Sequence, residues 1–217
     1  MSAIDTVLFD LDGTLIDTAP DMAGALEKLC IEESQATLDY DIVRPQVSNG
    51  SVALVRLAFG EELSGLRLEQ LKQRFLELYE QTLAERSGPF NGMPELLSEL
   101  QQRGIRWGVV TNKPGWLTLP LMDALGLADA AACIVSGDTT EHSKPHPAPM
   151  HHACELSGTT PQKCIYIGDA ERDIEAGRRA GMRTVIAKWG YIDADHDIDA
   201  WQADHHIDAP ADIVNLL

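Results

Sequence analysis

Two aspartates separated by one residue, Asp10 and Asp12, follow a short apolar run near the N-terminus. In a turned loop, residues two positions apart can both face one small site, and Gly13 lets the backbone turn tightly and approach a ligand. Paired carboxylates can serve as a nucleophile, as a general acid and base, or as ligands of a hard cation. The plainer alternative is that both acids only cap the following helix, so the pair needs support from elsewhere in the chain.

Polar clusters also follow each of the later apolar runs. Residues 111–113 (Thr-Asn-Lys) follow one run, and Lys144 lies in the loop after the next. The last cluster holds Asp169 and Asp173. In an open parallel sheet, ligands bind just outside the carboxyl ends of the strands, so a hydroxyl, a cation and several acids would converge on the edge that carries Asp10. Helix capping alone does not account for so many coincidences.

The elements that must position these residues alternate between short apolar runs and longer amphipathic stretches. Strand alternating with helix is typical of a parallel sheet covered on both faces. We therefore predict an α/β fold with a Rossmann-like parallel sheet and helices on both faces. The predicted strands are residues 6–10, 105–111, 133–136, 164–168 and 183–187, and the predicted helices of this part are residues 115–125, 148–157 and 171–180.

Residues 17–86 break this alternation. Thr18 as an N-cap, followed by a proline and an acid, predicts a helix start. Helical periodicity continues at residues 51–59 and 66–84, with no strand signal between. About 70 residues are too many for one crossover helix, so we predict an inserted helical cap domain at residues 17–86. Residues 1–16 and 87–217 would form the α/β core.

In their order and spacing, these clusters resemble the motifs of the haloacid dehalogenase superfamily, in its phosphatase branch with a helical cap inserted after the first motif. The resemblance covers essentially the whole chain. It implies that Asp10 is the nucleophile and Asp12 the general acid and base. It also implies that Thr111 binds phosphate through its hydroxyl, beside Asn112, and that Lys144 orients the phosphate as a fixed cation.

The same resemblance implies a Mg²⁺ cofactor. Its expected residues are Asp10, Asp12 (through the carbonyl), Asp169 and Asp173, the last either behind the metal or bracing Lys144. Mg²⁺ prefers a few carboxylates, water and substrate oxygens, and it neutralises the repulsion between a carboxylate and a phosphate. The implied activity is that of a phosphomonoesterase acting through an aspartyl-phosphate, in which Asp12 protonates the leaving alkoxide and then takes a proton from water.

The insertion is expected to select the ester. Residues 47–50 resemble the cap loop of phosphoglycolate phosphatases, and there Asn49 and Gly50 would place an amide and backbone N–H groups on the substrate. The alternative for Asn-Gly is an ordinary turn. Arg44 is a candidate for a substrate carboxylate or hydroxyl, or else an ordinary surface charge.

Another part of the chain favours a second subgroup. Residues 170–177, 188–191 and 201–204 resemble the N-acetylmuramic acid 6-phosphate phosphatases. The expected substrate is therefore N-acetylmuramic acid 6-phosphate or 2-phosphoglycolate. These three segments favour the first, but the preference is only modest because both subgroups share the core chemistry.

Two other functions stay open. A phosphosugar mutase of the beta-phosphoglucomutase type would share every core residue and would differ by returning the phosphate to the sugar. A non-catalytic phosphate-binding or switch protein would be expected to lack at least one core residue, and all are present. A zinc site is a weaker possibility, since prolines interrupt the helical pairing of the first two of four nearby histidines and no cysteine lies at ligand spacing. These histidines are His142, His146, His151 and His152.

Composition narrows the partners and the location. The 217 residues are 44% hydrophobic, which is typical of a globular protein, and carry a net charge of −17, which disfavours nucleic acid. No uncharged apolar run approaches the roughly 20 residues of a membrane span, and no secretory signal is seen. We expect a cytoplasmic monomer or homodimer whose partner is a small-molecule phosphate ester. Its reduced thiols would be Cys30, Cys133, Cys154 and Cys164.

Overall fold

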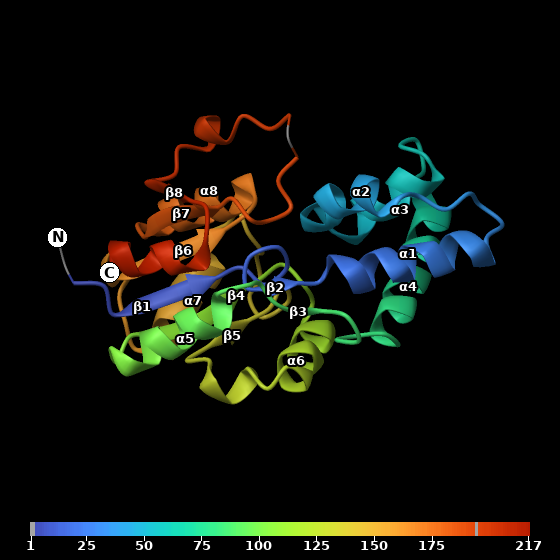
Figure 1. The fold of residues 1–217 in the computed structure, drawn as a ribbon. Helices are drawn as coiled ribbons and strands as arrows, with labels where there is room; N and C mark the ends of the chain where they lie inside the picture. The colour runs from blue at the N-terminus through green and yellow to red at the C-terminus, as the bar shows by residue number, and fades with distance from the viewer. Residues whose placement is uncertain (1–2, 194) are drawn as a thin grey trace.

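The structure, a computed structural model, describes residues 3–193 and 195–217. Within these residues a six-stranded sheet has the order β5-β4-β1-β6-β7-β8, and each neighbouring pair is parallel. The predicted α/β fold with a parallel sheet is confirmed (Figure 1). The strands are β1 (Thr6–Phe9), β4 (Arg106–Val110), β5 (Ile134–Val135), β6 (Cys164–Gly168), β7 (Arg183–Ala187) and β8 (His205–Ile207).

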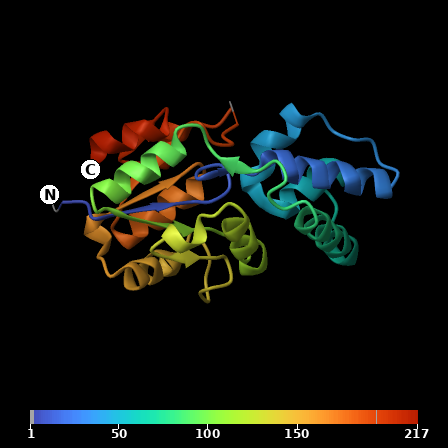
Figure 2. The same ribbon diagram turned by 60° about the horizontal axis from the view of Figure 1, so that its bottom comes forward.

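Helices cover both faces of this sheet because the central strands β1, β4, β6 and β7 are buried on both sides along nearly their whole length. Along β1, Val7 and Phe9 point into one hydrophobic cluster and Leu8 into the other, which is the two-residue period of a strand. Figure 2 shows the sheet between the two helical layers. One layer holds α5 (Met93–Gln102), α6 (Gly115–Ala124) and the 3₁₀ helix η5 (Pro210–Leu216), and the other holds α7 (Ala148–Ser157) and α8 (Glu171–Ala180).

The helices of residues 17–86 gather at one end of the molecule and pack around a hydrophobic cluster that also includes Leu117 and Tyr191 (Figure 1). Leu71, Phe75 and Leu78 lie on the buried side of α4, as the predicted periodicity requires. β2 (Ile16–Asp17) and β3 (Gly88–Pro89) form a short antiparallel pair at the two points where the chain enters and leaves these helices. The helices are α1 (Ala19–Glu32), α2 (Tyr40–Val43), the 3₁₀ helix η1 (Arg44–Asn49), α3 (Gly50–Phe59) and α4 (Gly65–Glu80).

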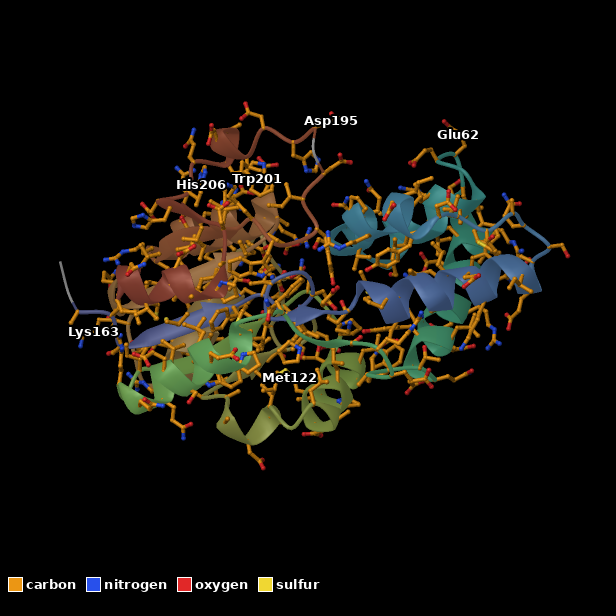
Figure 3. All side chains as sticks on the ribbon, in the orientation of Figure 1. Glu62, Met122, Lys163, Asp195, Trp201 and His206 are labelled. Atoms are coloured by element: carbon orange, nitrogen blue, oxygen red, sulfur yellow. The ribbon has the colours of Figure 1, made fainter. Side chains whose placement is uncertain are left out.

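The carboxyl ends of the strands face this helical unit. Lys163, which immediately precedes β6, lies at the opposite end of the sheet, whereas Glu62 lies in the helical unit (Figure 3). The C-terminus lies at the same distant end as Lys163 (Figures 1 and 3). Loops that follow the strands therefore open toward the helices, which is where the sequence places its polar clusters.

Several elements differ from the predicted ones. α5 and β8 were not predicted, and the helix expected at residues 66–84 ends at Glu80. β8 is short and its two histidines are exposed, so it lacks the apolar run that marks the other strands. No helix in the described part of the chain has the length and apolar character needed to cross a bilayer. The four cysteines are buried free thiols.

Candidate active site

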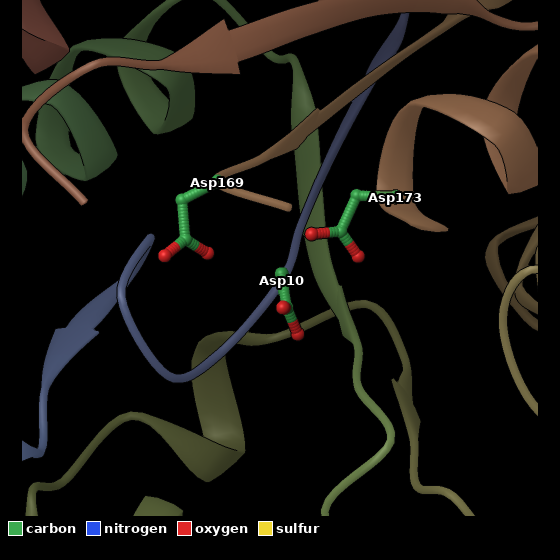
Figure 4. Close-up of side chains that lie close together, drawn as sticks. All are labelled: Asp10, Asp169 and Asp173. Carbon is green, nitrogen blue, oxygen red and sulfur yellow. The ribbon is translucent and has the colours of Figure 1, made fainter. Parts of the chain in front are cut away.

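Three acids come together at the carboxyl edge of the sheet. Asp10 directly follows β1, Asp169 directly follows the neighbouring strand β6, and Asp173 lies in the first turn of α8. One carboxylate oxygen from each lies within 4.8 Å of the others, and all three side chains are buried (Figure 4). In the described residues this is the one such group of acid, histidine or cysteine ligands, and it joins the first and last predicted motifs.

Lys144 places a positive charge next to two of these acids. Its Nζ lies 2.8 Å from Asp10 Oδ1 and 2.7 Å from Asp173 Oδ1. It also donates hydrogen bonds to the Val110 carbonyl and to the Tyr166 hydroxyl. A buried ammonium needs such partners to offset the loss of hydration, so Lys144 is fixed in place next to Asp10.

Asp173 uses both of its oxygens within the protein. Oδ1 accepts from Lys144, and Oδ2 accepts from the Ala170 N–H at 3.0 Å. Of the two positions that the resemblance allowed, Asp173 occupies the one that braces Lys144. Asp10 and Asp169 are the other two acids of the cluster, and Asp169 also accepts hydrogen bonds at both oxygens, from Thr14 at Oδ1 and from Ser48 at Oδ2.

Burial and crowding change the acidity of this cluster. Burial, together with the charge of Asp173, raises the pKa of Asp10 to about 7, and Lys144 offsets only part of that effect. Burial also raises the pKa of Asp169, again with a contribution from Asp173. The cluster therefore favours one additional positive charge. The oxygen donors fit a hard divalent cation such as Mg²⁺, which prefers carboxylates and water.

These shifts predict that Mg²⁺ binding is pH-dependent. Because the pKa of Asp10 is raised in the folded state, the metal-free protein loses stability as pH rises from about 4 to about 7. Below pH 7 most Asp10 carboxyls carry a proton, which Mg²⁺ must displace in order to bind. We expect Mg²⁺ affinity to be about 30-fold lower at pH 5.5 than at pH 8. Calorimetric titration of Mg²⁺ at both pH values measures this, and equal affinity would contradict the assignment of Asp10 as a ligand.

Asp12 lies beside this cluster and is oriented by two donors. Its Oδ1 accepts from Thr18 Oγ1 at 2.6 Å and from Lys113 Nζ at 2.8 Å. Among the described residues, Oδ2 has no hydrogen-bond donor, and Asp12 lines a cavity with Asp10. Oδ2 is therefore free to exchange a proton with a ligand. The predicted helix start is confirmed, since Thr18 occupies the N-cap position of α1, but its hydroxyl donates to Asp12 and makes no capping hydrogen bond.

The tight turn after Asp12 depends on Gly13. Its φ of +83° lies in the region that favours glycine. A Cβ there would lie 2.2 Å from Asp169 Oδ2. Gly13 thus lets the first loop approach Asp169, as its place in the sequence suggested.

The cavity lies between the helical unit and the core, with a volume of about 300 Å³. This is at the lower end of the size of small-molecule sites, roughly 300–1,000 Å³. The predicted residues on its wall are Asp10, Asp12, Asn49, Gly50, Thr111 and Asn112.

Two predicted substrate residues are used in other contacts. The Asn112 side chain both donates to the Lys144 carbonyl and accepts from the Lys144 N–H, at 2.9 Å each, so it positions that residue. Arg44 is absent from the cavity wall among the described residues. Its guanidinium donates to the carbonyls of Trp189 and Gly190 and lies over the Tyr191 ring, so it joins the helical unit to the core.

The histidine group predicted to belong to loops and helix faces is not part of the cavity wall in the described chain. The rings of His142 and His146 lie against each other with centroids 4.3 Å apart and their planes tilted by 48°. His152 lies 3.4 Å from Glu155, one turn along α7.

Ser48, near the end of η1, and Arg172, in the first turn of α8, were missed by sequence reasoning and connect these two elements. Ser48 Oγ donates to Asp169 Oδ2 at 2.6 Å, and the Ser48 carbonyl accepts from Arg172. Burial disfavours the charge of Arg172, but the nearby acids, Asp173 first, raise its pKa overall. These contacts join residues more than a hundred positions apart, so no local pattern could have found them.

Tyr191 is a further residue that the sequence did not identify. Its hydroxyl accepts from the Thr18 and Ala19 N–H groups at the start of α1 and donates to Asp17. Its own N–H donates to Asp169 Oδ2 at 2.9 Å. Tyr191 therefore caps α1 from the core side and connects the entry of the helical unit to the acid cluster.

Comparisons with known proteins agree with this geometry. Residues 7–187 match the family model of haloacid dehalogenase-like hydrolases. The chain is similar to an N-acetylmuramic acid 6-phosphate phosphatase of Pseudomonas aeruginosa, with 40% identity over 99% of this chain and 95% of that protein. A phosphoglycolate phosphatase of Xanthomonas campestris is 41% identical over 94% of this chain and 92% of that protein. A solved structure described as a predicted phosphoglycolate phosphatase from Haemophilus somnus has a TM-score of 0.88 and 28% identity, covering 100% of this chain and 99% of that one.

Proposed function

Because this chain belongs to the haloacid dehalogenase-like hydrolase family, we propose that it hydrolyses phosphate monoesters of small metabolites with Mg²⁺, through an aspartyl-phosphate on Asp10. The observation that carries the proposal is the position of Asp10. It lies on the cavity wall, 2.8 Å from the Lys144 ammonium and in one cluster with Asp169. Asp12 stands beside it with one free oxygen.

The first step follows from these positions. An oxygen of the Asp10 carboxylate attacks phosphorus, the bond from phosphorus to the ester oxygen breaks, and Asp12 gives that oxygen a proton. Thr111, on the cavity wall, offers a hydroxyl to the phosphate, and Lys144 keeps Asp10 oriented. Mg²⁺ held by Asp10 and Asp169 would neutralise the repulsion between the carboxylate and the phosphate.

The second step releases phosphate. Water attacks phosphorus while Asp12 takes its proton, and the bond from phosphorus to Asp10 breaks, so both residues return to their starting state. The helices at residues 17–86 act as a cap domain in this proposal. Their loop at Ser48 and Asn49 lies over the site and limits the access of other water.

The names of the relatives support a choice of substrate. Their names denote two phosphate esters of carboxylic acids, N-acetylmuramic acid 6-phosphate and phosphoglycolate. We propose that this chain acts on one of these two esters. The volume of the cavity between cap and core is within the range of small-molecule sites, which supports a small metabolite.

Phosphate release from a panel of esters tests the proposal. The panel is N-acetylmuramic acid 6-phosphate, 2-phosphoglycolate, glucose 6-phosphate and beta-glucose 1-phosphate, each with Mg²⁺ and with EDTA. We expect EDTA-sensitive release, with one of the two acid esters leading in kcat/KM. An isomeric sugar phosphate without free phosphate would indicate a mutase, and no turnover of any ester would contradict the proposal.

Replacing Asp12 with Asn is expected to lower kcat for alkyl phosphates by about 10²- to 10⁴-fold, the usual contribution of general acid–base catalysis. p-Nitrophenyl phosphate has a leaving group that needs no proton, so its first turnover should persist as a burst while the second step stalls. Rapid-mixing absorbance measures the burst. Asp138→Asn is the control, because Asp138 only accepts from the Gly115 N–H at the start of α6. Unchanged kinetics in Asp12→Asn would show that another group moves the proton.

A further inference from the structure

A second buried ammonium group, Lys113, lies on the cavity wall without a place in the mechanism above. Its side chain is 5% exposed. Nζ donates to Asp12 Oδ1 at 2.8 Å and to the Tyr79 hydroxyl at 2.9 Å, and it lies over the Tyr79 ring. An ammonium has three N–H donors, and no acceptor among the described residues takes the third.

The charge of Lys113 is balanced by one carboxylate only. Burial raises the pKa of Tyr79 to about 12, so its phenol stays neutral at ordinary pH. Burial disfavours the ammonium, but Asp12 and Tyr79 raise the pKa of Lys113 overall, so it keeps its charge. Asp12 must itself carry a proton in the first step of the proposed reaction. At that point no charged acid among the described residues pairs with Lys113.

The other two cations near the cavity lie beside the acids of the phosphate end. Lys144 contacts two acids and two further oxygens beneath Asp10. Arg172 lies near Asp173, Asp10 and Asp169, whose charges raise its pKa, and it donates to Ser48. Lys113 bridges Asp12 and Tyr79 of α4, so it lies on the cap side of the proton donor, where the alcohol part of a substrate would leave.

The rest of the wall on that side is apolar. Met22 and Leu76 come from the cap, and Pro114 and Leu117 come from the core. A neutral oxygen could accept from the third Lys113 donor, but a hydrogen bond from an ammonium to an anionic acceptor is stronger than one to a neutral acceptor. An anionic group on the alcohol would therefore be the stronger partner of Lys113.

We propose that Lys113 binds a carboxylate on the alcohol part of the substrate, so that the site selects phosphate esters of hydroxy acids over neutral phosphate esters. The inference rests on the proposed function, because it takes Asp10 as the end that receives phosphate. Tyr79 of the cap holds Lys113 only when cap and core are together. Selection therefore occurs in the closed state that performs the reaction.

Matched pairs of esters test the proposal. One pair is 2-phosphoglycolate and its amide, and the other is N-acetylmuramic acid 6-phosphate and N-acetylglucosamine 6-phosphate, which lacks the acid side chain. A charge-assisted hydrogen bond predicts that the wild-type protein prefers the acid by about 10- to 100-fold in kcat/KM in at least one pair. Lys113→Met should reduce that ratio to near one, and Lys188→Met, at an exposed ion pair with Asp208, should leave it unchanged.

The ratio of kcat/KM for the acid to kcat/KM for its uncharged partner distinguishes a Lys113 that binds the substrate from a Lys113 that only positions Asp12. If Lys113 only orients Asp12, Lys113→Met lowers kcat/KM for acid and amide equally, and the proposal is overturned. If the wild-type protein shows a ratio near one in both pairs, the proposal is overturned without any variant. Binding of the same esters to Asp10→Asn, measured by calorimetry, needs no turnover. If the wild-type protein hydrolyses none of them, the proposed function fails, and the acid-to-amide affinity ratio still decides whether Lys113 binds the carboxylate.

Discussion

Replacing Asp10 with Asn is expected to lower kcat by at least about 10⁴-fold, with the fold unchanged. The amide has the shape of the carboxylate but cannot attack phosphorus, and no other free carboxylate oxygen among the described residues shares its place on the cavity wall beside Lys144. Steady-state phosphate release measures the loss, and far-UV circular dichroism checks the fold.

A matched substitution at the surface controls this experiment. Asp208 is exposed and pairs with Lys188, away from the cavity wall. Asp208→Asn should keep full activity. Activity within tenfold of the wild-type protein in Asp10→Asn would show that Asp10 is not the nucleophile.

Lys144→Ala is expected to lower the free energy of unfolding by about 3–5 kcal/mol at pH 8, besides abolishing turnover. Lys144 is the ammonium that touches both Asp10 and Asp173, and its removal leaves these buried acids facing each other. Urea unfolding measures the loss. Lys163→Ala is the control, since Lys163 is half-exposed and lies 3.8 Å from Asp5, so it should change the free energy by less than about 1 kcal/mol.

The pH dependence of this loss has a definite sign. Burial and the charge of Asp173 already raise the pKa of Asp10 to about 7 with Lys144 present. Without Lys144 the pKa of Asp10 rises further, and a raised folded-state pKa means that stability is lost as pH increases. The destabilisation by Lys144→Ala should therefore be smaller at pH 5 than at pH 8. A loss of the same size at both pH values would show that the acids do not repel each other.

The sheet and the core site could be predicted because their signals are local. Each predicted strand is a short apolar run, and the residue that follows it lies at the carboxyl edge by the rule for parallel sheets. Asp10 and Asp169 could be placed together in this way, since β1 and β6 are neighbours. α5 carried a usable signal, with a proline in its first turn and leucines at helical spacing.

The connections between cap and core could not be predicted, because they depend on tertiary contacts. Arg44 looked like a free cation, but the carbonyls of Trp189 and Gly190 accept its hydrogen bonds. Thr18 occupies the predicted N-cap position, but the hydroxyl of Tyr191, 173 positions away, accepts from the N–H groups at the helix start. A side chain that can cap a helix can also donate to a nearby carboxylate, and only the fold decides between them.

Detection of a phosphoryl group on Asp10 tests the central claim most directly. The Asp12→Asn variant is mixed with Mg²⁺ and p-nitrophenyl phosphate, quenched in acid within the burst, and analysed by intact-protein and peptide mass spectrometry. We predict the added mass of one phosphoryl group, located on the peptide that contains Asp10. Release of p-nitrophenol with no phosphoryl group on the protein, or with the group on another residue, would contradict the mechanism.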